Sequence, residues 1–403
     1  MKFGKQHLHD LPVSDITTLG AYADQLQLEA EARGEVLPPP VRLQIGEPNY
    51  RTPEHIRQAA IESIANEIQT YTPTAGWPWL RELLAEKIAR VNGYEVKPIN
   101  TTIAPGGTGA LQAALLTLVG PGDEVLIPDP CWPLYIPQLA VTGATPVPYP
   151  LDPQGEWLPD IRQLGRLLTP HTRALIINTP GNPTGAVFPQ EVVRDLLIFA
   201  HDHDLYLISD ECYDEILFEG QHVSPASLLS PAEFESGRFI GIYTFSKSYA
   251  MTGWRIGYAV AGTQLIKTLT DVLNANFTSL STATQRAAAA ALTGPQDCVT
   301  EMCEGYRERR DLVVKLLKEY NRYVYTPHGA FYALIDVRGK NGESHSGRSF
   351  VLDLIRERNV SVAPGTSFGS ISAEYIRISL AASMEELERG VREICIFADR
   401  KGG

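Results

Sequence analysis

The stretch "RFIGIYTFSKSYAMTGWRIGY", residues 238–258, begins as an apolar, β-branched run and then presents a lysine between two serines. The run at 238–243 predicts a buried strand, because short segments rich in β-branched and aromatic residues favour strands. Lys247 follows this strand directly, and Arg255 follows eight residues later, beyond a glycine and a tryptophan. Since a lone lysine at a strand end is most often a solvated surface residue, the role of Lys247 depends on the rest of the chain.

Four short apolar runs, with helix-length segments between them, set the expected fold. They are "DEVLIP", "RALIIN", "DLYLIS" and "RFIGIY", all between residues 53 and 294. Strands joined by long crossovers predict a mainly parallel sheet covered by helices on both faces, an α/β fold. One of the helices is predicted over "TPEHIRQAAIESIANEI", with Thr52 as its cap.

The pattern changes after a long charged helix predicted over residues 296–320. It continues with "GAFYALIDV", a helix near 348–358, "EYIRISL" and a last helix from about 384. We therefore expect an N-terminal arm belonging to the small domain (1–52), a large domain (53–294) and a small α+β C-terminal domain (295–403).

Composition excludes several classes of protein. The net charge of −12 in 403 residues argues against a nucleic-acid partner. The five cysteines are scattered and form no CxxC pair, so we expect reduced thiols in a cytoplasmic protein and no metal site. No apolar run approaches the roughly 18 residues that a membrane span needs, and the N-terminus lacks the apolar core of a secretion signal.

Polar side chains follow the ends of the predicted strands, where ligands bind in doubly wound sheets. "GGTGAL" (106–111) opens a helix and could hold a phosphate. "TPGNPTG" carries Asn182, and Asp210, Tyr213 and Lys247 follow two further strands. Each feature has an ordinary alternative: a tight turn, a good turn sequence, or, for "DECYDE" (210–215), a solvated charge run or a metal cluster. Their order along one sheet edge favours a shared site.

Pyridoxal phosphate is the cofactor whose chemistry unites these residues. Its aldehyde needs a lysine, its phosphate needs N–H and cationic donors, and its ring nitrogen needs an acid. Lys247 would therefore bond to the aldehyde, Ser246 and Arg255 would bind the phosphate, and "MTGW" would fold the chain back toward that same anion.

The chain resembles the fold-type I pyridoxal phosphate enzymes and, among them, the class I/II aminotransferases of the aspartate aminotransferase type. "SKSYAMTGWRIGY" is the most specific motif, followed by "NTPGNPTG", "SDECYDEI" and "YTPTAGWPWLRE", and the resemblance covers residues 43–381. It implies a seven-stranded type of sheet and exchange of an α-amino group between an L-amino acid and a 2-oxo acid, pyruvate or 2-oxoglutarate. It also implies a homodimer with shared active sites.

The resemblance assigns a role to each site residue. Lys247 matches the lysine that bonds to the cofactor and moves the substrate's proton, Asp210 the partner of the ring nitrogen, and Arg377 with Gly46 the clamp on the substrate α-carboxylate. The remaining matches are to cofactor contacts: Gly107, Thr108, Thr244, Ser246 and Arg255 around the phosphate, Trp132 stacked on the ring, Asn182 and Tyr213 at its phenolic oxygen, and Tyr71 reaching the neighbouring subunit's phosphate. Trp132 and Asn182 also border the substrate.

Two alternatives stay open at this point. An enzyme on the same cofactor could catalyse β- or γ-elimination, replacement or cyclisation, because the cofactor residues create the carbanion without choosing its fate. A non-catalytic sensor built on this fold would need an added effector domain, and no DNA-binding segment is recognisable before residue 43. No residue matches the arginine that some members use for a second substrate carboxylate.

Overall fold

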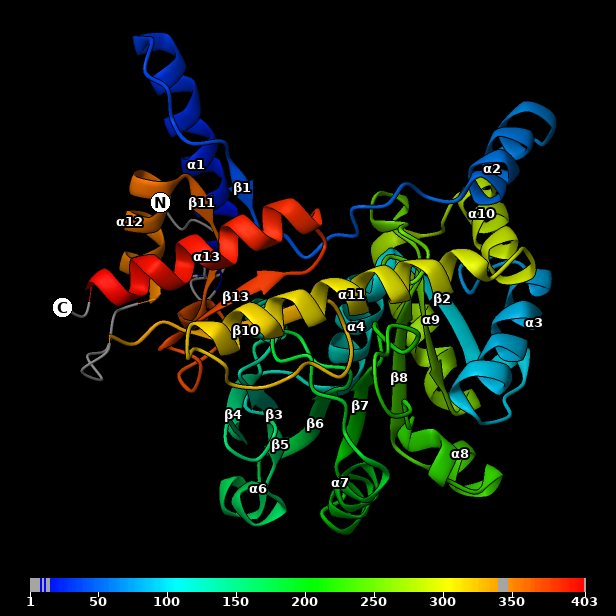
Figure 1. The fold of residues 1–403 in the computed structure, drawn as a ribbon. Coiled ribbons are helices and arrows are strands. Elements are labelled where there is room, and N and C mark those ends of the chain that lie inside the picture. The colour runs from blue at the N-terminus through cyan, green and yellow to red at the C-terminus, as the bar shows by residue number, and fades with distance from the viewer. Residues whose placement is uncertain (1–7, 9–10, 12–14, 340–346, 402–403) are drawn as a thin grey trace, which may run out of the picture.

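The computed structural model describes residues 8, 11, 15–339 and 347–401, and an eight-stranded sheet runs through its centre (Figure 1). In spatial order its strands are β2 (Thr101–Ala104), β9 (Gly257–Ala261), β8 (Phe239–Thr244), β7 (Tyr206–Asp210), β6 (Thr172–Asn178), β3 (Glu124–Asp129), β4 (Thr145–Asp152) and β5 (Leu158–Pro159). From β8 to β4 all neighbours are parallel, while β9 and β5 run antiparallel to their neighbours. The predicted α/β fold is confirmed, and the two-residue β5 extends the sheet to eight strands.

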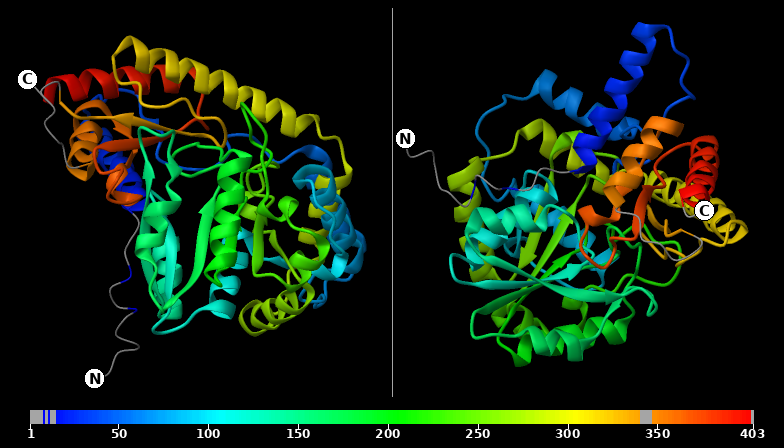
Figure 2. Two further views of the ribbon diagram at one scale, coloured as in Figure 1. Left: turned by 90° about the horizontal axis from the view of Figure 1, so that it is seen from below. Right: turned by 90° about the vertical axis from the view of Figure 1, so that its left-hand side faces the viewer.

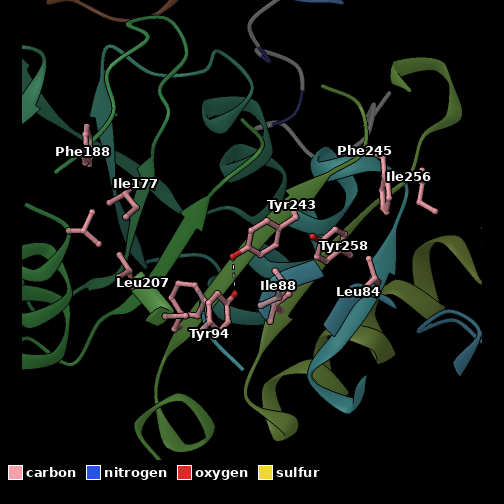
Figure 3. Packing of buried hydrophobic residues seen from close by; sticks show 14 of the residues in the cluster. Leu84, Ile88, Tyr94, Ile177, Phe188, Leu207, Tyr243, Phe245, Ile256 and Tyr258 are labelled. Atoms are coloured by element: carbon pink, nitrogen blue, oxygen red, sulfur yellow. Dashed lines mark hydrogen bonds between the residues drawn. The ribbon is translucent and has the colours of Figure 1, made fainter. Parts of the chain in front are cut away.

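Helices cover both faces of this sheet, as parallel strands require (Figure 2). Those between the strands are α4 (Gly106–Leu118), α5 (Tyr135–Thr142), α6 (Ile161–Leu167), α7 (Gln190–Asp202), α8 (Pro231–Ser236) and α9 (Thr263–Phe277). Successive side chains of β6 alternate between two cores: Ile176 packs with residues of α4, α5 and α9, and Ile177 packs with residues of α6 and α7. Figure 3 shows the second core, in which the hydroxyls of Tyr94 and Tyr243 lie 2.8 Å apart.

A helical group stands at the β2 edge of the sheet: α2 (Glu54–Asn66), α3 (Pro78–Lys87) with a π-helical turn (Ile88–Asn92), and α10 (Thr282–Thr293). The π-helical turn ends at Gly93, whose backbone is left-handed, with φ of 76°. The predicted Thr52 cap is wrong. Pro53 occupies the cap position, and the Thr52 hydroxyl instead donates to the Ala250 carbonyl at 2.6 Å and accepts from Trp254 Nε1 at 3.0 Å. Thr52 thus braces the loop that carries Lys247.

The C-terminal part packs together with the N-terminal segment. It contains α11 (Asp297–Glu319), β10 (Tyr332–Asp336), α12 (Gly347–Arg358), β11 (Val360–Ser361), β12 (Ala363–Pro364), β13 (Tyr375–Ser379) and α13 (Met384–Lys401). β10, β13 and β12 form an antiparallel sheet, and β1 (Val41–Arg42), which follows α1 (Asp15–Arg33), pairs with β11 (Figure 1). On this basis we propose the three-part division at residues 52 and 294. Among the described residues, no helix is long and apolar enough to cross a membrane.

Candidate active site

A cavity of about 820 Å³ opens at the carboxyl ends of β7 and β8 and is closed on its other side by β13 and the segment after β1. Every predicted site residue except Tyr71 lines it: Gly46, Gly107, Thr108, Trp132, Asn182, Asp210, Tyr213, Thr244, Ser246, Lys247, Arg255 and Arg377. Tyr71 lies outside, with 86% of its side chain exposed. The structure therefore brings residues from distant parts of the sequence to one edge of the sheet, where parallel sheets bind ligands.

Lys247 is the amine at the centre of this cavity. It follows β8, is half-buried, and donates from Nζ to the Gly46 carbonyl at 2.7 Å. Its ammonium lies 5.8 Å from the ring centre of Tyr213 and 5.6 Å from that of Phe331, within range of cation–π attraction. No carboxylate lies within ion-pair distance of Nζ among the described residues. The amine is consequently held by weak contacts that a ligand could replace.

The N-terminus of α4 forms a cradle of backbone donors. The helix begins at Gly106, so its first N–H groups have no partner within the helix and point toward the cavity. Gly106 has a φ of 75°, and a Cβ there would lie 2.6 Å from Arg255 Nη2, while a Cβ on Gly107 would lie 2.8 Å from Cys212 Sγ. Glycine at position 106 therefore lets the guanidinium of Arg255 approach the helix, and glycine at position 107 leaves room for the Cys212 side chain.

Hydroxyls and a cation complete the cradle. Arg255 adopts a left-handed backbone after the turn Thr252–Trp254 and donates to the Thr252 carbonyl at 2.7 Å. The hydroxyls of Thr244 and Ser246 lie 2.9 Å apart. Helix N–H groups, hydroxyls and one guanidinium form a donor set that suits a phosphate.

Asp210 is a buried carboxylate held only by neutral donors. It ends β7, is 5% exposed, and accepts a hydrogen bond of 2.6 Å from the Tyr135 hydroxyl and one of 3.3 Å from the Cys212 N–H. Burial raises the pKa of Asp210, and the bonds from Tyr135 and Cys212 oppose that rise. A carboxylate in this setting would be stabilised by a cationic N–H placed in the cavity.

Arg377 is a buried cation facing the same cavity. It lies on β13 with 2% exposure, stacks 4.4 Å from the ring centre of Tyr332, and donates to Asn182 Oδ1 at 3.2 Å and to the Gln44 carbonyl. Burial lowers the pKa of Arg377, its Nε has no hydrogen-bond partner, and none of the described carboxylates is within ion-pair distance. A buried guanidinium is rarely left unpaired, so a ligand carboxylate fits here.

The tyrosine and asparagine residues are fixed by their own contacts. The hydroxyls of Tyr213 and Tyr332 lie 2.8 Å apart, and the Asn182 N–H donates to Asn178 Oδ1 at 2.8 Å. A Cβ on Gly46 would lie 2.2 Å from the Tyr332 hydroxyl, so only glycine fits beneath it. The site is thus rigid where it faces Lys247.

Sequence reasoning missed several residues that shape the site: Gln44, Tyr135, Asn178, Cys212 and Tyr332. Tyr135 stands three residues after Trp132, and the two rings meet edge to face at 5.5 Å. Tyr135 is the first residue of α5 and Trp132 precedes that helix, so their short separation in the sequence was the available signal. The other four residues reach the site only because the folded chain brings distant segments together, and no sequence pattern indicates them.

Both alternatives for "DECYDE" are wrong. Two of its acids are buried and paired: Glu211 accepts from His222 Nε2 at 2.7 Å and from Ser224 at 2.8 Å, and Asp214 pairs with Lys87. No group of three or more potential ligands that could hold a metal occurs in the described part of the chain. The acids left over from the site therefore stabilise the fold beneath it.

Known proteins resemble this chain over most of its length. The family model for aminotransferase class I and II matches residues 38–394. The aspartate/prephenate aminotransferase of Thermus thermophilus is 38% identical over 87% of this chain and 89% of its own. The aromatic-amino-acid aminotransferase 2 of Thermococcus litoralis is 37% identical over 87% of this chain and 90% of its own.

Solved structures agree with these relatives. The Thermus thermophilus aspartate aminotransferase with maleate superposes with a TM-score of 0.88 and 34% identity, covering 98% of this chain and 100% of that one. Since the family model and these relatives each span well over two thirds of the chain, this protein belongs to the class I and II aminotransferases.

Proposed function

We propose that the protein exchanges the α-amino group between an L-amino acid and a 2-oxo acid on pyridoxal phosphate held in the cavity. The observation that carries this proposal is the meeting of Lys247, Asp210 and Arg377 around one space of about 820 Å³. Among the described residues, the Lys247 amine has no carboxylate partner, and it suits an aldehyde. The Asp210 carboxylate has no described cationic partner and suits a pyridinium, and the Arg377 guanidinium has no described anionic partner and suits a carboxylate.

The residues present fit the cofactor. The α4 N-terminus with Thr108, Ser246 and Arg255 would hold the phosphate, because a Cβ at Gly106 or Gly107 would fill that cradle. Asp210 would face the ring nitrogen, Trp132 a ring face, and Asn182 and Tyr213 the phenolic oxygen. When bound, the cofactor supplies an electron-withdrawing ring that weakens the C–H bond at the substrate's α-carbon.

The chain's own residues would then divide the work. Arg377 binds the α-carboxylate through its planar fork and orients the α-carbon toward Lys247. Lys247 Nζ takes the proton from the α-carbon of the amino acid, and in the second half-reaction returns a proton to the α-carbon of the oxo acid. Asp210, which accepts hydrogen bonds from Tyr135 and the Cys212 N–H, would hold a proton on the ring nitrogen.

A test separates transfer from elimination, replacement or cyclisation. One amino acid is added to the cofactor-loaded protein with no oxo acid present. A transferase releases one equivalent of oxo acid per site and stops until pyruvate or 2-oxoglutarate is added. Continued turnover with release of ammonia or a cyclised product would replace this reading with the first alternative. Borohydride reduction followed by peptide mapping should label Lys247, and a label on another lysine would overturn its assignment.

The proposal includes a homodimer, with Tyr71 reaching the partner's phosphate. Supporting it, the C-terminal end of α2 and the segment after it expose Ile61, Ile64, Ile68 and Tyr71 to 55%, 65%, 85% and 86%. Exposed apolar side chains grouped in this way mark an interface. Mixing Lys247→Ala subunits with weakened Tyr71→Phe subunits should regain activity by forming one intact site per hybrid dimer. No gain over the parent proteins would contradict shared sites.

The cytoplasmic location is likewise a proposal. It is supported by the five cysteines, which are all free. Relatives are named for aspartate, prephenate and aromatic amino acids, so the relatives leave the substrate's side chain open.

A further inference from the structure

The cavity divides into a part that fits the cofactor and α-carboxylate and a part left for the substrate's side chain. The second part is lined by α1 and by three loop segments, which contribute Ile45 and Glu47, Leu134, and Thr252. Nothing in the cofactor chemistry needs these residues, so they are the ones that can select among amino acids.

Within the described lining of the cavity, positive charge is confined to the part that fits the cofactor and the α-carboxylate. The cations among the described lining residues are Lys247, Arg255 and Arg377, which the cofactor and the α-carboxylate would occupy. The charged residues in the side-chain part are both acids, Asp24 and Glu47. A second substrate carboxylate would therefore meet negative charge without a cation to pair with, which is unfavourable both for desolvation and for repulsion.

Arg42, a cation next to α1, is bonded to protein groups through Nε and Nη1. Its Nε pairs with Asp24 Oδ1 at 3.2 Å, and its Nη1 donates to Asn359 Oδ1 at 3.1 Å. Arg42 does not line the cavity. The Glu47 carboxylate accepts from the Thr252 hydroxyl, a neutral donor that leaves its charge in place.

Apolar surface dominates what remains. Ile45 is 53% exposed and Leu134 is 36% exposed at the cavity, although both are large aliphatic residues. Ile45 stands between Gln44, whose carbonyl accepts from Arg377, and Gly46, whose carbonyl accepts from Lys247. Ile45 thus lines the cavity between the two residues that contact Arg377 and Lys247.

Helix α1 adds to this surface because it packs very closely on the clamp. A Cβ on Gly20 would lie 2.9 Å from Gln44 Nε2, so the helix approaches through a glycine. Ile16, Thr17 and Ala21 then share the helix face that turns to the cavity, at a spacing of four or five residues.

We propose that the preferred amino donor carries a neutral, apolar side chain of aromatic or branched aliphatic type, and that a dicarboxylic donor is disfavoured. The proposal rests on the proposed function. Ile45, Leu134 and the α1 face bind the side chain by burying apolar surface, and a second carboxylate would lie near Glu47 without a cation among the described lining residues to pair with.

Two unreactive probes test this in the cofactor-loaded protein. The dissociation constants of 3-phenylpropanoate and succinate are measured by titration calorimetry. Both offer one carboxylate to Arg377, and they differ in the other end of the molecule. The phenyl compound should bind at least about tenfold more tightly. Equal binding, tighter binding of succinate, or binding of neither probe would overturn the proposal.

Variants show which residues select the side chain of the substrate. Ile45→Ala should weaken 3-phenylpropanoate about fivefold and leave succinate unchanged. Ile198→Ala on α7 is the matched control, because Ile198 is 49% exposed and lies outside the cavity lining. Thr17→Arg should strengthen succinate binding by supplying the missing cation. Equal weakening of both probes in Ile45→Ala would mean that Ile45 acts through the clamp and does not select the side chain.

Steady-state kinetics keep this inference separate from the proposed function. Phenylalanine should have a higher kcat/KM than aspartate with the same oxo acid. A protein that transfers the amino group of aspartate more efficiently contradicts the inference and leaves the function standing. A protein that releases oxo acid from neither contradicts the function itself.

Discussion

Two buried cations, Lys87 and Arg377, have almost the same exposure and opposite surroundings. Lys87 is 4% exposed and pairs with Asp214, with Glu215 Oε2 a further 3.9 Å contact and Asn92 Oδ1 at 3.0 Å. Arg377 is 2% exposed, and its partners are a carbonyl, an amide oxygen and two aromatic rings. Burying a charge is costly unless it is paired. Lys87, which is paired, therefore stabilises the fold, and Arg377, which has no carboxylate partner among the described residues, is available to bind a ligand.

Lys87 should give the largest effect on stability. Burial alone would lower the pKa of Lys87, but the attraction of Asp214 and Glu215 raises it, so these acids stabilise the charged form of Lys87. Lys87→Met leaves two acids buried without a cation, and breaking such a pair costs about 3–5 kcal/mol. The free energy of unfolding is measured with urea in the cofactor-free protein.

Arg377→Met is the matched variant in that experiment. It leaves no carboxylate unpaired among the described residues, so it should lose less than half as much stability while activity disappears. Equal losses in the two variants would mean that Arg377 also serves the fold, and the contrast between the two cations would fail.

Asp210 should give the next largest effect, this time on rate. No described cation is within ion-pair distance of Asp210, whereas Asp214, four residues along, pairs with Lys87. Asp210→Ala should keep the cofactor bound through its phosphate and Lys247, and slow removal of the α-proton by at least about a hundredfold, or ~2.7 kcal/mol. Stopped-flow measurement with α-deuterated substrate isolates this step. Near-normal turnover would show that another group protonates the ring nitrogen.

The sequence indicated those site residues whose position follows from the strand directly before them. Lys247, Asp210 and the glycines of α4 each follow a strand within a few residues, so strand prediction placed them at one edge of the sheet. Contacts between distant segments leave no pattern in the local sequence. Lys87 and Asp214 are 127 residues apart, and nothing in "DECYDE" indicates that Asp214 pairs with Lys87. Tyr332 meets Tyr213 only because β10 crosses above the cavity.

β4 escaped prediction for a physical reason. Its sequence "TPVPYPLD" has proline at every second position, which argues against a central strand. β4 pairs with β3 along its length, while on its outer side β5 pairs only with Leu151 and Asp152. The missing N–H groups therefore cost little along an edge that has no partner.

A substitution at Gly106 tests whether the α4 N-terminus binds the phosphate, and its expected effect on binding is smaller than the effects above. Gly106→Ala places a Cβ 2.6 Å from Arg255 Nη2 at a φ of 75°, a left-handed conformation that costs a non-glycine residue about 1–2 kcal/mol. Gly120→Ala is the control, since its Cβ would meet nothing within 4 Å. Titration of inorganic phosphate into the cofactor-free protein should show weaker binding in Gly106→Ala alone. Unchanged binding would place the phosphate elsewhere.

The smallest effect concerns the pH dependence of stability without cofactor. Because burial raises the pKa of Asp210, the folded protein favours its protonated form more than the unfolded chain does. The stabilising contribution of Asp210 is thus complete below the ordinary aspartate pKa of about 3.9 and is lost as the pH rises through the higher pKa of the folded state. Above that pH the buried charge opposes folding.

Asp210→Asn removes this charge and should make the cofactor-free protein more stable than the parent at neutral pH, with the difference shrinking toward acid pH. Urea midpoints measured at several pH values give the curve, and Asp195→Asn, an exposed acid on α7, is the control that should change nothing. Adding cofactor should reverse the order, because the parent carboxylate then gains its cation while the amide does not. A difference in stability between Asp210→Asn and the parent that is the same at every pH, or that persists with cofactor bound, would contradict this prediction. It would mean that Asp210, like Asp214, stabilises the fold and does not depend on a cationic ligand.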